Sequence, residues 1–209
     1  MTNLNPEKFK ENGYCIIRSA ISNELRDVVT QYALFDEMQD YRADNTQVIG
    51  AHSKYADPVM ESILLHLHSV MEANTGLTLH PTYSFYRVYR NGDELKAHID
   101  RPSCEISVSL CFNYSYNDEK YQWPMYLNDH NTGADLRPGD MVIYRGRDLR
   151  HWREKFNPPE DSWHVQGFFH YVDVNGPYAD YKNDQRSTIG DNSRTKVSTS
   201  TKPYITFTK

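Results

Sequence analysis

The chain has 209 residues and a formal net charge of −5, which favours one domain with a single core and argues against bulk nucleic-acid binding. No apolar run approaches membrane-spanning length, and residues 1–6 lack the basic start and the apolar core of a signal peptide. The three cysteines, at positions 15, 104 and 111, are too few for a disulfide framework, so a reducing cytoplasm is expected.

Helical patterns dominate residues 5–78. The segment 6–13 predicts a short helix closed by glycine, and residues 14–18 predict a strand. Ser22 is suited to cap a second helix, in which four residues would form one apolar stripe: Leu25, Val28, Val29 and Tyr32. A third helix over 60–71 would turn His66 and His68 in diverging directions, so these two histidines are expected to be structural or surface residues.

Residues 79–174 are rich in strand patterns. Six strands are predicted, over 82–90, 96–100, 105–114, 123–127, 140–145 and 163–173. Leu136–Asp140 holds Pro and Gly in the order that a tight turn requires. We therefore expect a mainly β (α+β) domain over 1–174, in which a mostly antiparallel, double-layered barrel (core 79–174) carries the N-terminal helices on one outer face.

Residues 175–209 form a polar tail. Its composition up to residue 202 is typical of a disordered appendage. In residues 204–208, however, apolar and polar side chains alternate as they would in a strand. A tail that docks on its own domain, or on a second subunit of a homo-oligomer, is the alternative.

Three residues are candidate metal ligands: His98 and Asp100 in a His-x-Asp motif, and His151 downstream. Side chains alternate along a strand, so residues 98 and 100 would point the same way and Ile99 would point away. His-x-Asp alone is a weak signal, but here it lies between two predicted strands. Two imidazoles and one carboxylate on one side of an ion leave further positions open, the layout of non-haem Fe(II) oxygenases.

Five further segments lie before and after this motif in a set order along the chain. They are residues 9–18, Tyr89-x-x-Gly92, the strand 106–113, the segment 138–144 before His151, and the strand 164–171. Together they resemble the Fe(II)/2-oxoglutarate-dependent dioxygenases, and most nearly the prolyl-hydroxylase-like branch with its microbial and viral members. The resemblance implies a jelly-roll (double-stranded β-helix, cupin-like) fold. It also implies Fe(II), O2 and 2-oxoglutarate, which is converted to succinate and CO2, with ascorbate as a stimulant.

One departure from the family concerns the residue that holds the distal carboxylate of 2-oxoglutarate. The family usually places an Arg or Lys on the strand after the distal histidine, whereas here that strand offers His164 and Gln166. Arg153, two residues past His151, is the other candidate, because its planar guanidinium suits bidentate carboxylate binding. The alternative for Arg153 is a surface ion pair with Glu154 or Asp161.

Other residues are expected around the cofactors. Tyr89 matches a family tyrosine near the cosubstrate, although a barrel-wall aromatic is the alternative. By alternation along 105–113, Ser107, Ser109, Cys111 and Asn113 would face the cavity, and Val108, Leu110 and Phe112 would face the helices. Cys111 is expected to be a small filler rather than a nucleophile.

The substrate is the least determined element. The resemblance and the presence of Asp100 favour hydroxylation, with demethylation or desaturation as alternatives, of a small molecule or a peptidyl side chain. Six arginines between Arg87 and Lys155 would attract an anion: Arg87, Arg90, Arg101, Arg145, Arg147 and Arg150. Acidic neighbours that balance them are the alternative. Two other classes stay open, a cupin-like metal enzyme that uses no 2-oxoglutarate and a jelly-roll binding module without catalysis.

Overall fold

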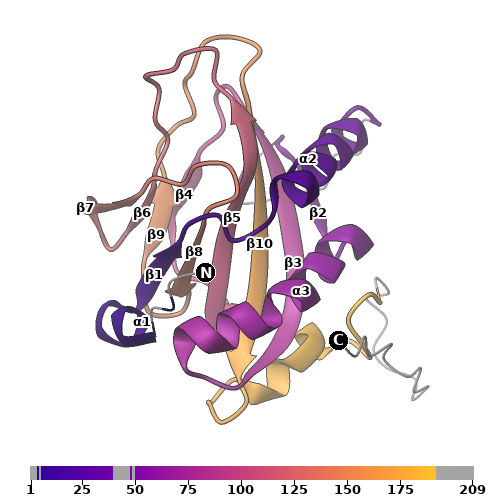
Figure 1. Ribbon diagram of the computed structural model, residues 1–209, viewed down its shortest axis with the longest axis vertical. Coiled ribbons are helices and arrows are strands. Elements are labelled where there is room, and N and C mark those ends of the chain that lie inside the picture. Colours follow the sequence, from indigo (N-terminus) through magenta and orange to yellow (C-terminus); the bar gives the residue numbers. More distant parts are fainter. Residues whose placement is uncertain (1–3, 5, 40–47, 49, 192–209) are drawn as a thin grey trace.

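The computed structural model describes residues 4, 6–39, 48 and 50–191. Two antiparallel sheets form the body of the molecule (Figure 1). The larger sheet consists of β1 (Tyr14–Ile17), β2 (His52–Tyr55), β3 (Leu79–Arg90), β5 (Ile106–Ser115), β8 (Met141–Arg145) and β10 (Trp163–Asp173). The smaller sheet consists of β4 (Leu95–His98), β6 (Met125–Leu127), β7 (Asp129–Ala134) and β9 (His151–Arg153). Their strand orders are β1-β8-β5-β10-β3-β2 and β4-β9-β6-β7.

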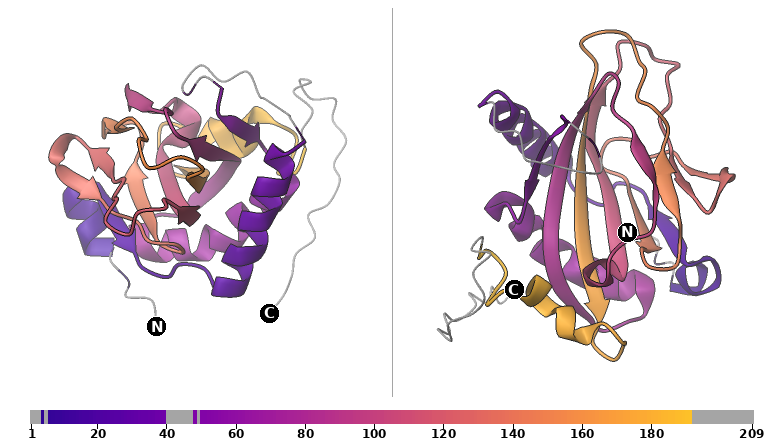
Figure 2. Two further views of the ribbon diagram at one scale, coloured as in Figure 1. Left: turned by 90° about the horizontal axis from the view of Figure 1, so that it is seen from above. Right: turned by 180° about the vertical axis from the view of Figure 1, so that it is seen from behind.

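Helices cover the outer face of the larger sheet, as the views from above and behind show (Figure 2). They are α1 (Pro6–Asn12), α2 (Asn23–Glu37) and α3 (Pro58–Thr75). Ser22 caps α2 through a hydrogen bond from the Leu25 amide, as predicted, and Gly76 ends α3 in the left-handed conformation. The predicted apolar stripe of α2 is wrong at Val28, which is 66% exposed, because α2 packs through Val29 and Ala33 instead.

The core lies on both sides of β5, whose side chains alternate as predicted from Ile106 to Phe112. Beyond a register shift, Asn113 pairs with Val165 of the helix-side cluster, so the prediction that Asn113 faces the cavity is wrong. Ile106, Val108, Leu110 and Phe112 pack with the helices in one hydrophobic cluster. Cys111, on the opposite face, packs with Met125 and Leu127 of the smaller sheet. The alternation therefore separates an apolar layer beneath the helices from an interior layer between the sheets, where polar side chains gather.

Several element boundaries differ from the sequence-based ones. The strands β2, β7 and β9 were not predicted, and β4 ends at His98 rather than at residue 100. Asp100 therefore follows the strand instead of ending it. The predicted turn before β8 is present, since the Asp140 amide donates to the Arg137 carbonyl and Gly139 has a φ of 89°.

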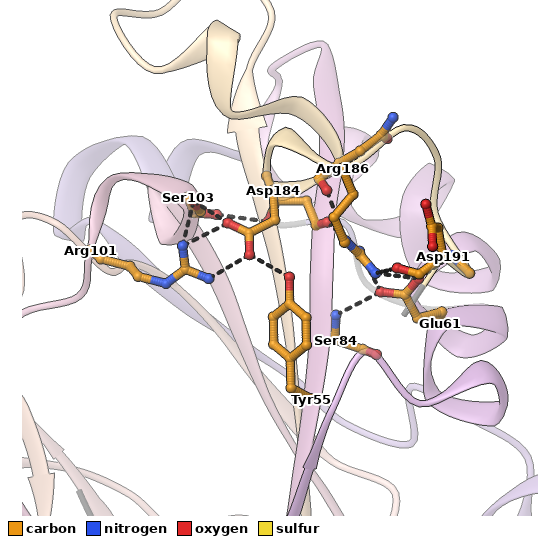
Figure 3. A network of polar contacts seen from close by, with 11 residues as sticks. Tyr55, Glu61, Ser84, Arg101, Ser103, Asp184, Arg186 and Asp191 are labelled. Atoms are coloured by element: carbon orange, nitrogen blue, oxygen red, sulfur yellow. Dashed lines mark hydrogen bonds and ion pairs between the residues drawn. The ribbon is translucent and has the colours of Figure 1, made fainter. Parts of the chain in front are cut away.

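Residues after β10 fold back onto the larger sheet (Figure 3). In the 3-10 segment η2 (Ala179–Gln185), Asp184 accepts two hydrogen bonds from Arg101, at 2.6 and 2.8 Å, and one from Ser103. Residues 183–185 all have positive φ, a conformation that costs about 1–3 kcal/mol per non-glycine residue. The contacts of Asp184 offset part of this strain. The strand predicted within 204–208 lies outside the described residues.

Within the described part of the chain, no helix is long and apolar enough to cross a membrane.

Candidate metal centre

Three predicted ligands converge between the two sheets. His98 ends β4 and His151 begins β9, and the two residues are direct partners in the smaller sheet. Their Nε2 atoms lie 3.6 and 3.5 Å from Oδ1 of Asp100. Ile99, between the two motif residues, is 52% exposed and forms no part of the cluster. Each of the three ligands offers one donor atom, and the three atoms lie within 4.8 Å of one another.

Hydrogen bonds to the backbone orient both imidazoles. Nδ1 of His98 lies 2.7 Å from the Lys96 carbonyl, and Nδ1 of His151 lies 2.9 Å from the Leu149 carbonyl. A carbonyl oxygen only accepts, so each Nδ1 carries a hydrogen. In the neutral ring, Nε2 then carries a lone pair on the side of Asp100, which is the form a metal ligand needs.

The carboxylate of Asp100 is also fixed by its surroundings. The Asp100 amide donates to the Gly146 carbonyl at 2.8 Å, and Ser107 donates to Oδ2 at 3.0 Å. Gly146 packs so closely that a Cβ at this position would lie 2.3 Å from Oδ2 of Asp100. Residue 146 must therefore be glycine if the carboxylate keeps this position.

Protonation of the cluster follows from burial and hydrogen bonding. Burial raises the pKa of Asp100, but the hydrogen bonds from His151 and His98 outweigh it and hold the pKa well below its ordinary value. Burial lowers the pKa of His98, but its bonds to Asp100 and to the Lys96 carbonyl outweigh this effect, and the pKa is raised. A metal would displace the proton that His98 holds, because both bind to the same lone pair.

A second set of donor atoms adjoins the first. Asp100, Cys104 and His170 also bring donor atoms within 4.8 Å of one another. Ser107 Oγ lies 2.9 Å from Nδ1 of His170, so Ser107 accepts from His170 when it donates to Asp100. Sequence reasoning missed Cys104 and His170. Alternation along the predicted strand 163–173 would have put His170 on the same face as Gln166.

The residues expected near the distal carboxylate of 2-oxoglutarate form one buried network. Arg153 is 1% exposed and donates to Gln166 Oε1 at 3.2 Å and to the Trp123 carbonyl at 2.6 Å. Gln166 donates to Ser109 at 2.9 Å, and His164 contacts Oε1 of Gln166 at 2.5 Å. Arg153 forms no surface ion pair among the described residues; it lies over the Trp123 ring, 4.5 Å from the centroid.

His164 is electrically neutral in this network. Burial, and then the positive charge of Arg153, lower the pKa of His164 to about 3. Its Nε2 faces the acceptor Oε1 of Gln166, and its Nδ1 accepts from the Tyr116 hydroxyl at 2.7 Å. The imidazole therefore orients Gln166 without adding a positive charge.

A second buried arginine was not among the predicted site residues. Arg87, on β3, is 1% exposed and donates to the hydroxyl of Tyr89 at 3.0 Å. Tyr89 is itself fully buried, with its ring edge-on to Trp123. The sequence indicated Arg87 only as one of six arginines that would attract an anion. Two others of that set are paired, Arg90 with Glu37 and Arg101 with Asp184.

The remaining sequence-based expectations concern residues away from the cluster. His66 is exposed on α3, and His68 contacts the Leu79 carbonyl and stacks on Tyr171, so both are surface or structural residues as expected. Burial raises the pKa of Cys111, which keeps it a thiol in an apolar cluster.

No protein-family model matches the sequence, and no curated protein matches it. Solved structures do match. A prolyl-4-hydroxylase from Pseudomonas putida has a TM-score of 0.60 and 17% identity over 78% of this chain and 95% of that chain. A prolyl hydroxylase from Trichoplax adhaerens, in complex with a hypoxia inducible factor peptide, has a TM-score of 0.61 and 16% identity over 82% and 88%. The epimerase SnoN, in complex with Fe3+, α-ketoglutarate and nogalamycin RO, has a TM-score of 0.66 and 10% identity over 92% and 91%.

These similarities establish the fold. The chain is a double-stranded β-helix of the kind found in 2-oxoglutarate-dependent oxygenases, prolyl hydroxylases among them. The predicted fold class and the predicted resemblance are thereby confirmed at the level of architecture.

Proposed function

We propose that this protein is an Fe(II)- and 2-oxoglutarate-dependent oxygenase whose metal ligands are His98, Asp100 and His151. The observation that carries the proposal is the convergence of one ionised carboxylate and two backbone-oriented imidazoles in a fold that such oxygenases share. Two histidines and one carboxylate are the donor set that suits non-haem Fe(II) with open positions. When bound, that centre couples decarboxylation of 2-oxoglutarate to succinate and CO2 with oxidation of the substrate.

Arg153 is the proposed partner of the distal carboxylate of 2-oxoglutarate. It is buried, it follows His151 by two residues on β9, and among the described residues its Nε has no hydrogen-bond partner. The neutral His164 is less suited to this role, since only an imidazolium would supply the opposite charge. Gln166 and Tyr89, together with Ser107 beside Asp100, are proposed to complete the surroundings of the cofactors.

The substrate is proposed to be a small molecule or a peptidyl side chain that undergoes hydroxylation. The Trichoplax enzyme was solved with a peptide and SnoN with nogalamycin RO, so this fold accommodates both classes. Nucleic acid is disfavoured, because the chain is acidic and Arg90 and Arg101 are engaged in ion pairs. All three cysteines are buried and free, which fits the proposed reducing, cytoplasmic location.

The test is catalysed succinate release by protein supplied with Fe(II), 2-oxoglutarate, O2 and ascorbate. We expect wild type to release succinate and to bind one Mn(II), a redox-silent substitute, whereas His151→Ala should do neither and still fold. His66→Ala, the same substitution at an exposed histidine, is the matched control and should behave as wild type. Normal succinate release by His151→Ala would refute the ligand assignment. Metal binding without succinate would favour the cupin-like alternative, and absence of both would favour a binding module.

A further inference from the structure

Arg87 is a buried cation without a counter-ion in the described part of the chain. Its Nη1 donates to the Tyr89 hydroxyl, but its Nε and Nη2 have no hydrogen-bond partner among the described residues. The guanidinium lies 5.2 to 5.8 Å from the ring centroids of Phe85, Tyr89 and Phe168. A charge removed from water is strongly destabilising unless another group pairs with it. An anionic ligand would supply that pairing.

The unpartnered atoms form one edge of the guanidinium. Nε and Nη2 are the two donors of the side-on fork that binds both oxygens of a carboxylate. The same protein provides the template: Arg90, on the same strand, donates from Nε and Nη2 to the two oxygens of Glu37 at 2.9 and 2.5 Å. Arg87 therefore presents the edge that Arg90 uses, and no described residue accepts a hydrogen bond from it.

Arg87 lies beside the proposed 2-oxoglutarate site and is separate from Arg153. Across the β3–β10 pairing, Arg87 is the direct partner of Gln166, and Gln166 Oε1 accepts from Arg153. Directly opposite residues of an antiparallel pair place their side chains on the same face of the sheet. Two guanidinium groups therefore reach the same interior from two strands, and one distal carboxylate needs only one of them.

Charge balance indicates a further anion, on the basis of the proposed function. Fe(II), the Asp100 carboxylate and the 2-oxoglutarate dianion sum to one negative charge, and the histidines count as neutral imidazoles. Arg153 and Arg87 add two positive charges, so one positive charge is left over. Asp93 does not supply the missing negative charge as an ion-pair partner of Arg87. Burial raises the pKa of Asp93 and the charge of Arg87 lowers it, but the carboxylate accepts a hydrogen bond from the Arg90 amide and forms no ion pair with Arg87.

We propose that Arg87 binds a carboxylate of the primary substrate through Nε and Nη2, with Phe85 and Phe168 against the adjoining apolar part of that molecule. A carboxylate is favoured over a phosphate because a single two-donor edge matches its two oxygens. The aromatic surroundings also disfavour a dianion. The substrate class is thus a carboxylic acid with an apolar group next to the acid.

The test is calorimetry on protein loaded with Mn(II) and N-oxalylglycine, an unreactive analogue of 2-oxoglutarate. The probes are acetate, benzoate and phenylacetate, each with its uncharged amide, and inorganic phosphate. We expect wild type to bind at least one carboxylate about tenfold or more tighter than its amide, as expected for charge-assisted hydrogen bonds. Arg87→Gln should abolish this preference and leave N-oxalylglycine affinity unchanged. Arg90→Gln, on the same strand, is the matched control and should keep both.

Other outcomes overturn the proposal. They are the absence of any carboxylate preference in wild type, a preference that survives Arg87→Gln, and phosphate binding in place of carboxylate binding. Loss of N-oxalylglycine affinity in Arg87→Gln would assign Arg87 to the cosubstrate instead. If wild type binds neither Mn(II) nor N-oxalylglycine, the proposed function fails. A carboxylate preference measured on the metal-free protein would still support the role of Arg87.

A second variant separates a ligand-binding role from a structural one. Arg87→Met removes the unpaired charge and keeps an unbranched apolar stem, so the ligand-free variant should unfold at the same temperature as wild type or higher. The carboxylate probe should raise the melting temperature of wild type and not that of the variant. A marked fall in the melting temperature of the ligand-free variant would mean that Arg87 is a structural residue, and would overturn the proposal.

Discussion

Arg186→Leu should strongly destabilise the protein, because it would leave a buried carboxylate without its counter-ion. Glu61 on α3 and Arg186 after η2 have side chains only 2% and 5% exposed, and their closest N–O distance is 2.7 Å (Figure 3). Arg186 also donates to the carbonyls of Thr82 and Asp191, at 2.9 and 3.0 Å. Removing one partner of a buried pair costs about 3–5 kcal/mol. For a domain of this size, that corresponds to a fall of roughly 6–20 °C in the melting temperature.

Urea unfolding of three variants would measure this effect. The double variant Glu61→Leu/Arg186→Leu should lose less free energy of unfolding than Arg186→Leu, since no unpaired charge is then left buried. Arg90→Leu breaks the ion pair with Glu37, whose side chains are 44% and 19% exposed, and should change the free energy of unfolding by only about 1 kcal/mol or less. If Arg186→Leu behaved like Arg90→Leu, residues 175–191 would contribute little to the fold, and the reasoning would fail.

Three further outcomes are expected. Arg153→Ala should weaken 2-oxoglutarate binding by roughly 2–4 kcal/mol with little change in metal affinity. In wild type, the affinity for 2-oxoglutarate should stay nearly constant between about pH 6 and 8.5, because arginine stays charged there. A steady loss of 2-oxoglutarate affinity with rising pH in calorimetry would point to an imidazolium anchor. Gly167→Ala should lower the free energy of unfolding by about 1–3 kcal/mol, because a Cβ at this position would lie 2.6 Å from the Phe112 ring. An unchanged midpoint of urea unfolding would contradict this loss of stability. The pKa of His164 is about 3 in the fold and about 6.5 when unfolded, so the unfolded state takes up a proton first and the free energy of unfolding should fall as the pH drops from about 6.5 towards 3. In urea titrations from about pH 7 to 5, His164→Gln should lose less free energy of unfolding per pH unit than wild type. Equal slopes for the two proteins would count against a buried, neutral ring.

The fold was predictable where short-range periodicity reports the packing directly. On β5, one apolar residue in two gave both faces correctly from Ile106 to Phe112, because a strand has only two faces; it failed at Asn113, after a register shift that periodicity does not reveal. On α2, the same reasoning failed at Val28. Apolar residues lie on more than one side of that helix, and sequence periodicity alone does not say which side meets the sheet. The strand β9 is polar and has only three residues, so its pairing with β4 and β6 follows from tertiary structure that no local pattern encodes.

The candidate site was predictable where chemistry restricts the residue types, and not where it depends on register. His98, Asp100 and His151 were found because few side chains can bind a metal and their order along the chain resembles a known family. Arg87 was predicted only as one of six arginines that would attract an anion, and its burial was missed because arginine is almost never fully buried, so the default expectation is an exposed side chain. Its inward direction depends on the pairing with Gln166, beyond an irregularity in the β3–β10 register at residues 170 and 171.

The proposed metal centre depends on both sheets at once, because its candidate ligands are held from different sides. The two histidines belong to the smaller sheet and are oriented by carbonyls close by in their own segments. Asp100 is held from the other side: its backbone amide donates to the carbonyl of Gly146, just after β8, and its carboxylate accepts from Ser107 on β5 of the larger sheet. Donor atoms that converge from two layers keep their spacing only while the layers stay packed. The apolar cluster around Cys111, Met125 and Leu127, which joins the layers, therefore also sets the geometry of the site.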